Sequence, residues 1–191
     1  MPFGGMTDRG IVRAGLRALG EAAEGPAAEA AIDAVLAGYL PILAEELAQT
    51  PGIRLHPGVE AVLDAAQTRP GVAVGLGTGN IRPGALLKLG RVGIADRFAF
   101  GGFGSDHEDR AALLAIGAAR GAAALGCAPE RCRVVVVGDT PRDVAAARAI
   151  GAESLVLATS GFTEAVLRAS GATHVFPDLA APGALAALLG G

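Results

Sequence analysis

The sequence predicts an α/β fold, in which a Rossmann-like parallel sheet is covered by helices and preceded by an N-terminal helical cap. The first 50 residues show the three- and four-residue apolar spacing of helices, whereas the residues after the break at 50–58 alternate short apolar runs with helical segments. Such alternation is typical of parallel sheets, because each strand needs a crossover to return to the same end of the sheet. At 191 residues and 51% hydrophobic residues, the chain is long enough to bury one core.

The cap, 1–55, is predicted to contain two helices. Thr7 or Asp8 can cap the first helix, which ends at a break over 20–26. In the second helix, apolar residues recur at helical spacing and share one face: Ile32, Val35, Leu36, Tyr39, Leu43 and Leu47. Pro41 is expected to kink or divide this second helix, because proline lacks the N–H donor that a helix interior requires.

The core, 56–191, is predicted to begin with a helix at 59–67 and then to alternate strands with helices. Each predicted strand is a short apolar run bounded by turn residues, as is typical of strands buried in a parallel sheet. The predicted strands are 71–76, 98–102, 133–137 and 154–158. The predicted helices between them are 82–90, 109–125 and 142–150, and a weaker helix and strand are expected beyond residue 163.

Charge and composition argue against several classes of protein. A net charge of −3, 4% aromatic residues and no Trp make a nucleic-acid-binding surface unexpected. The longest stretch without a charged residue, Leu179 to Gly191, is too short for a membrane span, and the N-terminus lacks the pattern of a secretion signal. We therefore expect a cytoplasmic protein without a membrane partner. Cys127 and Cys132 are expected to be free thiols, since no further Cys or His stands at zinc-site spacing.

Candidate functional residues follow two of the predicted strands, because ligands of open parallel sheets bind beyond the carboxyl ends of the strands. At the first place, four valines lead into GDTPRD at 138–143. Thr140 is expected to cap the next helix with Pro141 at its first position, which brings Asp143 close to Asp139. Two converging carboxylates suit Mg²⁺, which prefers oxygen ligands. The alternative is structural: Asp143 favours the helix dipole and Asp139 fills a turn.

The second place is GVAVGLGTGN, in which Thr78, Gly79 and Asn80 follow a predicted strand. A hydroxyl group and glycine-freed backbone N–H groups at a strand-to-helix junction suit a phosphoryl oxygen. TGN is also an ordinary turn composition, which is the structural alternative. A dinucleotide fingerprint is a further alternative, although Asn80 stands where GxGxxG requires its third glycine.

A cation for the same site is expected from Arg110, which is predicted to open the helix that precedes the GDTPRD strand. A guanidinium group supplies bidentate donors and a permanent charge to a phosphate. The alternative is a solvated Arg110 that pairs with Asp106 or Glu108. Lys88, the only lysine, lies within an apolar helix, where a snorkelling surface lysine is more typical, and it is not part of a phosphate-binding P-loop motif.

Three of these features occur in a fixed order along the chain: an apolar run before TGN, a basic residue at a helix start and an apolar run before GDTxxD. In this order they resemble motifs two, three and four of the haloacid dehalogenase superfamily. The chain most resembles the phosphoglycolate-phosphatase-like hydrolases, and the similarity extends across nearly the whole chain. The resemblance implies a Mg²⁺-dependent phosphatase that forms an aspartyl-phosphate from a small phosphorylated metabolite. It implies catalytic roles for Thr78 and Arg110. It further implies phosphate binding by Thr78, Gly79, Asn80 and Arg110, and Mg²⁺ binding by Asp139 and Asp143.

The first motif of that family, DxDxT, does not occur in the sequence, since no two of its aspartates are separated by a single residue. In the family this motif supplies the nucleophile and general acid from a strand in the middle of the sheet, beside the strand that here ends at Asp139. We expect the strands next to that position to show unpaired backbone groups and exposed apolar surface. We further expect a fragment of a longer phosphatase, with an in-frame DxDxT upstream in the gene.

As the chain stands, we expect no turnover of p-nitrophenyl phosphate. The alternatives are a pseudo-enzyme that binds phosphate and metal without catalysis, and a nucleotide-dependent oxidoreductase. The resemblance also implies that the cap selects the substrate, for which Asp8, Arg9 and Arg13 are candidate contacts; solvated surface charges are the alternative. The sequence predicts neither the individual substrate nor the oligomeric state.

Overall fold

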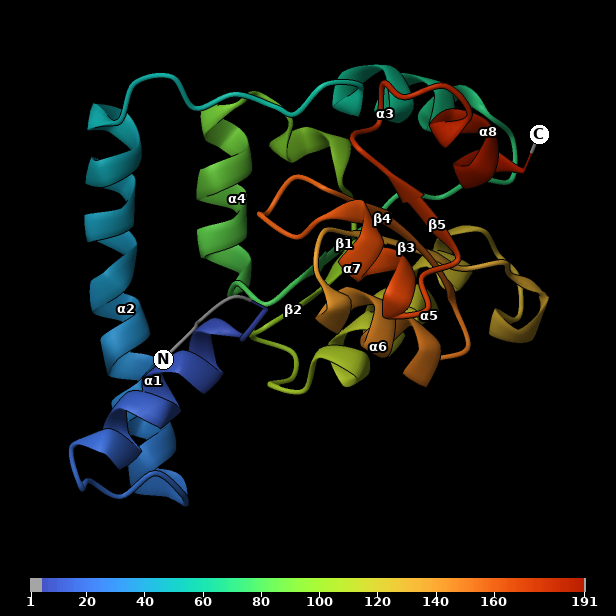
Figure 1. Ribbon diagram of the computed structural model, residues 1–191. Helices are drawn as coiled ribbons and strands as arrows, with labels where there is room; N and C mark the ends of the chain where they lie inside the picture. Colours follow the sequence, from blue (N-terminus) through green and yellow to red (C-terminus); the bar gives the residue numbers. More distant parts are fainter. Residues whose placement is uncertain (1–4, 191) are drawn as a thin grey trace.

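The computed structural model describes residues 5–190, so the first four residues of the predicted cap and the final glycine lie outside the described part. The helices are α1 Asp8–Ala18, α2 Pro26–Gln49, α3 Val59–Thr68, α4 Arg82–Arg91, α5 Arg110–Ala124, α6 Pro141–Ala149, α7 Glu164–Ala169 and α8 Ala184–Leu189, with 3-10 turns η1 Ala95–Arg97 and η2 Pro129–Arg131. The strands are β1 Leu76–Thr78, β2 Gly101–Phe103, β3 Val135–Gly138, β4 Glu153–Leu157 and β5 His174–Phe176. The predicted α/β class is confirmed, and Figure 1 shows α2 lying beside α4 and α1 against the lower part of α2, away from most of the strands.

The strands form two parallel sheets rather than one continuous sheet. β1 pairs with β2, with Thr78 opposite Phe103, whereas β3, β4 and β5 form the second sheet, with Gly138 opposite Val156. Helix α5 packs against both β1 and β2 and also contacts α6, which covers β3 and β4. The same pair of helices therefore holds the two sheets in one frame, although no strand pairing joins them within residues 5–190.

The predicted strand at 71–76 is wrong over most of its length. Residues 72–75 belong to no strand, and β1 begins at Leu76, whose N–H donates to the carbonyl of Phe100 at 3.1 Å. An apolar run becomes a strand only where a partner offers backbone groups, and hydrophobic pattern alone does not show where the partner begins. The other predicted strands differ from the observed ones by one to three residues at their ends.

Side-chain caps begin four of the described helices, α1, α5, α6 and α7, and those of α1 and α6 lie next to the segments that carry candidate site residues. The hydroxyl of Thr7 accepts the N–H of Gly10 at 3.2 Å, so Thr7 rather than Asp8 caps α1. At α6, the predicted cap is confirmed: Thr140 accepts the N–H of Asp143 at 3.4 Å, and the Asp143 carboxylate accepts the N–H of Thr140 at 3.0 Å. This reciprocal pair is a capping box, and it fixes the direction in which the loop after β3 enters the helix.

Helix α2 is continuous through Pro41, so the predicted division of this helix is wrong. Because Pro41 has no N–H group, the carbonyl of Ala37, four residues earlier, lacks its helical donor. Ala37 is exposed, so water can hydrate this carbonyl instead. Buried Ile32 and Leu36 hold α2 in place by packing against Ile81, at the start of α4. Burial of these side chains favours the continuous helix despite the lost hydrogen bond.

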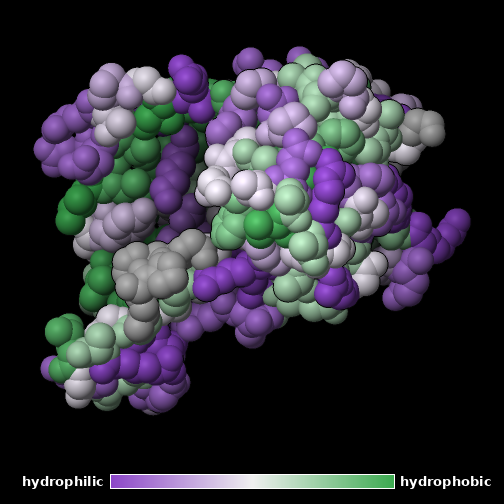
Figure 2. Space-filling model, viewed as in Figure 1, coloured by the Kyte–Doolittle hydropathy of each residue, from purple (hydrophilic) through white to green (hydrophobic). Residues whose placement is uncertain are grey.

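Within the described part of the chain, α2 is also the one helix whose length and composition would allow it to cross a membrane. It carries four carboxylate residues, Glu29, Asp33, Glu45 and Glu46, and packs against α1 and α4. Figure 2 shows apolar surface along this helix, where Val35 and Ile42 are exposed. The expectation of a cytoplasmic protein without a membrane partner stays a prediction, as does the cap boundary near residue 55.

Candidate functional site

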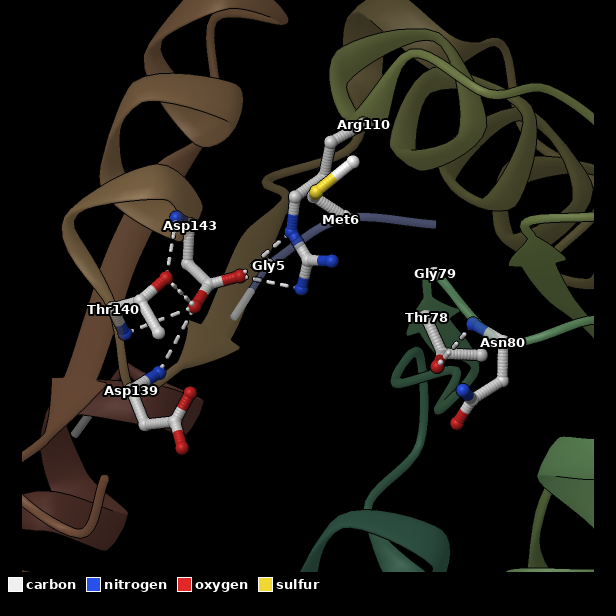
Figure 3. Close-up of a pocket in the computed structure, with 9 residues that line it drawn as sticks. All are labelled: Gly5, Met6, Thr78, Gly79, Asn80, Arg110, Asp139, Thr140 and Asp143. Atoms are coloured by element: carbon white, nitrogen blue, oxygen red, sulfur yellow. Dashed lines mark hydrogen bonds and ion pairs between the residues drawn. The ribbon is translucent and has the colours of Figure 1, made fainter. Parts of the chain in front are cut away.

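The carboxyl ends of β1 and β3 border one pocket of about 180 Å³. Since a water molecule occupies about 30 Å³ in the liquid, this volume accommodates a phosphate-sized anion together with water. Figure 3 shows the loop after β3 on one side, the loop after β1 on the other and Arg110 reaching in from the start of α5. The nine residues that line the pocket are Gly5, Met6, Thr78, Gly79, Asn80, Arg110, Asp139, Thr140 and Asp143. All six predicted site residues therefore lie around one cavity.

Asp143 is almost fully buried, and both of its carboxylate oxygens are occupied by hydrogen bonds. Oδ2 accepts the backbone N–H groups of Asp139 and Thr140 at 3.1 and 3.0 Å, and the Thr140 hydroxyl at 2.8 Å. Oδ1 accepts Nε and Nη2 of Arg110 at 2.9 and 2.6 Å. With five donors on two oxygens, Asp143 positions the loop and Arg110, while its predicted contact with Mg²⁺ stays a prediction.

Asp139 has the opposite character, since burial raises the pKa of its carboxyl group and the nearby charge of Asp143 raises it further. A bound divalent cation would offset both effects. The part of the chain that the structure describes has no group of three His, Cys, Asp or Glu side chains able to hold a metal. Mg²⁺ is commonly held by one or two carboxylates, with water and substrate phosphate as the other ligands, so Asp139 fits this ion as a direct ligand.

Asp139→Asn is expected to raise the melting temperature of the metal-free protein at pH 7. Because the folded pKa of Asp139 lies above its usual value of 3.8, protonation stabilises the fold, and this contribution is lost as the pH rises through the folded pKa. The difference between the variant and the parent should therefore shrink in buffers near pH 4. Saturating Mg²⁺ should raise the melting temperature of the parent by roughly 5–10 °C and that of the variant much less.

Asp96→Asn, an exposed carboxylate outside the pocket, is the matched control and should leave the melting temperature and its Mg²⁺ response unchanged. Differential scanning calorimetry with and without Mg²⁺ measures all three proteins. An equal Mg²⁺ response in the Asp139→Asn protein would exclude Asp139 as the metal ligand.

The loop after β1 is held in a compact turn, in which the Thr78 hydroxyl accepts the N–H of Asn80 at 3.1 Å. Gly79 is buried, and a Cβ at this position would lie 2.6 Å from the carbonyl oxygen of Met6. Only glycine allows the two backbone segments to approach this closely. The loop thus presents a hydroxyl and backbone groups to the pocket, as expected of a phosphate-binding turn.

Asp8 and Lys88 support this loop, and neither role was predicted. The Asp8 carboxylate accepts the side-chain amide of Asn80 at 2.9 Å and the N–H of Ile81 at 2.8 Å. The ammonium group of Lys88 donates to the side-chain oxygen of Asn80 at 3.2 Å. The acidic first turn of α1 offers a weak signal for Asp8, but its partners lie more than 70 residues away. Lys88 therefore orients Asn80, while the lining cation is Arg110, as expected.

Arg110 pairs with Asp143. The alternative predicted for Arg110, a pair with Asp106 or Glu108, is therefore wrong. Asp106 pairs instead with Arg120 at 2.7 Å. Glu108 pairs instead with Arg13 at 2.6 Å. Figure 3 shows the third guanidinium nitrogen of Arg110 on the side away from Asp143. This nitrogen remains available to an anion in the pocket, because the two nitrogens that bind Asp143 are the other two.

Gly75 and Gly77, which raised the dinucleotide alternative, serve packing instead. A Cβ at Gly75 would lie 2.3 Å from the ring of Phe100, and a Cβ at Gly77 would lie 2.4 Å from the Leu114 side chain. These glycines leave space for core side chains rather than for a pyrophosphate. The arrangement therefore favours the phosphate-site interpretation over the oxidoreductase alternative.

The cap arginines lie in an ion-pair cluster that connects α1 and α2 to the loop before α5. Arg13, with 9% exposure, donates through Nε and Nη2 to Glu108 at 3.0 and 2.6 Å, and Nη2 also lies 2.5 Å from Glu29. Arg9 pairs with the same Glu29 at 2.5 Å. Because Glu108 stands two residues before Arg110, the cluster links the cap to the segment that carries the pocket cation.

In a comparison with known protein families, the family model of the haloacid dehalogenase-like hydrolases matches residues 9–151. The matched segment contains both loops of the pocket, Arg110 and most of the cap. Comparison with the curated proteins finds no match.

Proposed function

The chain belongs to the haloacid dehalogenase-like hydrolase family, and we propose that it forms the phosphate and Mg²⁺ site of a phosphatase for a small phosphorylated metabolite. The observation that supports this proposal best is the convergence of Thr78, Arg110 and Asp139 on one pocket from three separate segments of the chain. An anion-binding turn, a fixed guanidinium group and the half-buried carboxylate of Asp139 supply the charges that phosphoryl transfer requires.

Each residue has a distinct role in this proposal. The Thr78 hydroxyl and the N–H group of Gly79 bind phosphoryl oxygens, since the N–H groups of Asn80 and Ile81 donate to Thr78 and Asp8, and Arg110 neutralises the phosphoryl charge. Asp139 holds Mg²⁺, and Asp143 orients both the Asp139 loop and Arg110 through its five hydrogen bonds. Bound Mg²⁺ would add positive charge at the transferring phosphoryl group. Similarity to the phosphoglycolate-phosphatase-like branch is the more specific part of the proposal and rests on the ordered motifs alone.

The residues given contain no aspartate in a DxD pattern, the pattern that supplies the nucleophile of the proposed aspartyl-phosphate reaction. The 191-residue chain is therefore expected to bind phosphate and Mg²⁺ without hydrolysing p-nitrophenyl phosphate. A pseudo-enzyme, the alternative interpretation, would also bind phosphate and Mg²⁺ without turnover. The missing DxD pattern agrees with this alternative as well. Metal-dependent hydrolysis by this chain that Asp139→Asn abolishes would contradict both interpretations.

Calorimetric titration of inorganic phosphate in the presence of Mg²⁺ tests the proposed site. Thr78→Val is expected to weaken phosphate binding by about tenfold, because a buried charge-assisted hydrogen bond contributes about 1.5–3 kcal/mol. Thr68→Val is the matched control, since the Thr68 hydroxyl bonds only to carbonyl groups of its own helix, at 2.9 and 3.2 Å. Equal phosphate affinity in the two variants, or no binding by the parent protein, would contradict the proposal.

A further inference from the structure

The connection between α5 and β3 carries both cysteines of the sequence, Cys127 and Cys132. Both thiols are free, and each residue is partly exposed. A small oxidant in solution can therefore reach them. Neither cysteine lines the phosphate and Mg²⁺ pocket, and the proposed phosphatase reaction uses neither.

Backbone hydrogen bonds fold this connection into a tight turn. The N–H of Cys127 donates to the carbonyl of Ala122 at 3.1 Å, which ties the start of the turn to the last residues of α5. The 3-10 turn η2 follows, and the N–H of Cys132 donates to the carbonyl of Pro129 at 3.0 Å. The two cysteines are thus held at the two ends of one hydrogen-bonded turn.

The two thiols contact one another across the turn. They are hydrogen-bonded side chain to side chain, and the thiol of Cys132 also donates to the carbonyl of Ala128, with a sulfur-to-oxygen distance of 3.6 Å. The bond to Cys127 raises the pKa of Cys132, and burial raises it further. Cys132 is therefore protonated at neutral pH and reacts slowly with oxidants by itself, because the thiolate is the reactive form.

We propose that Cys127 and Cys132 are a modification site, at which a peroxide converts the thiol pair into a reversible disulfide. The Cys127 thiolate attacks one peroxide oxygen and the O–O bond breaks, which gives a sulfenic acid on Cys127 and, after proton uptake, water or an alcohol. The Cys132 sulfur then attacks the Cys127 sulfur and the S–O bond breaks. The departing hydroxide takes the Cys132 proton and leaves as water. In sum, the thiol pair loses two electrons and the peroxide gains them.

The disulfide would join the end of α5 to the start of β3. α5 begins at Arg110 and β3 leads into Asp139, so the cross-link would connect two elements that carry pocket residues at their far ends. Because the thiols already touch, closing the bond requires little backbone movement. The inference does not depend on the phosphatase proposal, since it involves no pocket residue and no bound phosphate.

Mass spectrometry of the full chain after treatment with hydrogen peroxide tests the reaction. Because the sequence has only two cysteines, a monomer that loses two hydrogen atoms and resists alkylation contains this disulfide. Dithiothreitol should restore both thiols. We expect Cys132→Ser to stop at a sulfenic acid that dimedone traps, and Cys127→Ser to react about tenfold more slowly than Cys132→Ser.

Exchange with reduced and oxidised glutathione measures how well the fold brings the thiols together. We expect the effective concentration of the thiol pair to be at least about tenfold higher in the folded chain than in concentrated urea, because the native turn already holds the thiols in contact. The matched control combines Cys132→Ser with Arg131→Cys, which moves the second thiol by one residue to an exposed position. Its effective concentration in the folded chain should be about tenfold lower than that of the parent.

Several results would overturn the proposal. They are alkylation of both thiols after peroxide treatment, a disulfide that forms only between two chains, and sulfinic acid without a disulfide. An effective concentration that is no higher in the folded parent than in urea, or that is equal in the shifted control, would also overturn it. The comparison of folded and unfolded parent requires no substitution, so it decides the question even if a variant does not fold.

Discussion

Asp143→Ala is expected to lower the free energy of unfolding by about 3–5 kcal/mol, the largest effect of any single substitution considered. The Asp143 side chain is 2% exposed and accepts five hydrogen bonds. Its removal leaves the Arg110 guanidinium without its charge partner and two backbone N–H groups without acceptors. Urea denaturation of parent and variant measures the difference.

Glu164→Ala is the control for Asp143→Ala, because it also removes a carboxylate that pairs with arginine. Glu164 and Arg168 are both well exposed and one helical turn apart, at 2.6 Å. Such exposed pairs contribute less than about 1 kcal/mol. Similar small losses in both variants would show that the Asp143 network does not hold the loop after β3.

Arg13→Met is expected to lower the free energy of unfolding by about 2 kcal/mol and to loosen the cap. Methionine keeps much of the apolar stem of Arg13 but removes its bonds to Glu108, Glu29 and the carbonyl of Ala23. Because this cluster connects α1 and α2 to the segment before α5, amides of the two cap helices should exchange faster than those of β4. Hydrogen exchange and urea denaturation together measure both effects.

Arg17→Met provides the comparison within the same helix. Arg17 is 60% exposed and pairs only with exposed Glu24, so its loss should change stability little. If Arg13→Met and Arg17→Met had equal effects on cap exchange, the ion-pair cluster would not be what attaches the cap.

Local signals in the sequence predict the loop after β3 in detail. Thr140, Pro141 and Asp143 lie within four residues, so the cap, the first helical position and the closeness of Asp143 to Asp139 follow from their order, whereas the reciprocal bond of Asp143 to Thr140 was not predicted. The same reasoning predicts the turn at Thr78, because a hydroxyl and glycine directly follow an apolar run. These features depend on neighbours along the chain and need no knowledge of packing.

Long-range partners could not be predicted in this way. Asp8 reaches Asn80 across 72 residues of sequence, and Arg110 meets Asp143 because α5 packs against α6. Periodicity indicates which face of a helix is apolar, not which polar group lies opposite. For the same reason the apolar run at 71–76 does not reveal that most of it lacks a partner strand.

The most direct test of the central claim is a crystal structure of the chain with Mn²⁺, as an anomalously scattering substitute for Mg²⁺, and inorganic phosphate. The account predicts an anomalous peak at the Asp139 carboxylate and a phosphate between that ion and the loop of Thr78 and Gly79, with Arg110 in contact. Phosphate bound elsewhere, or a metal peak away from Asp139, would contradict the claim that these three segments form one phosphate site.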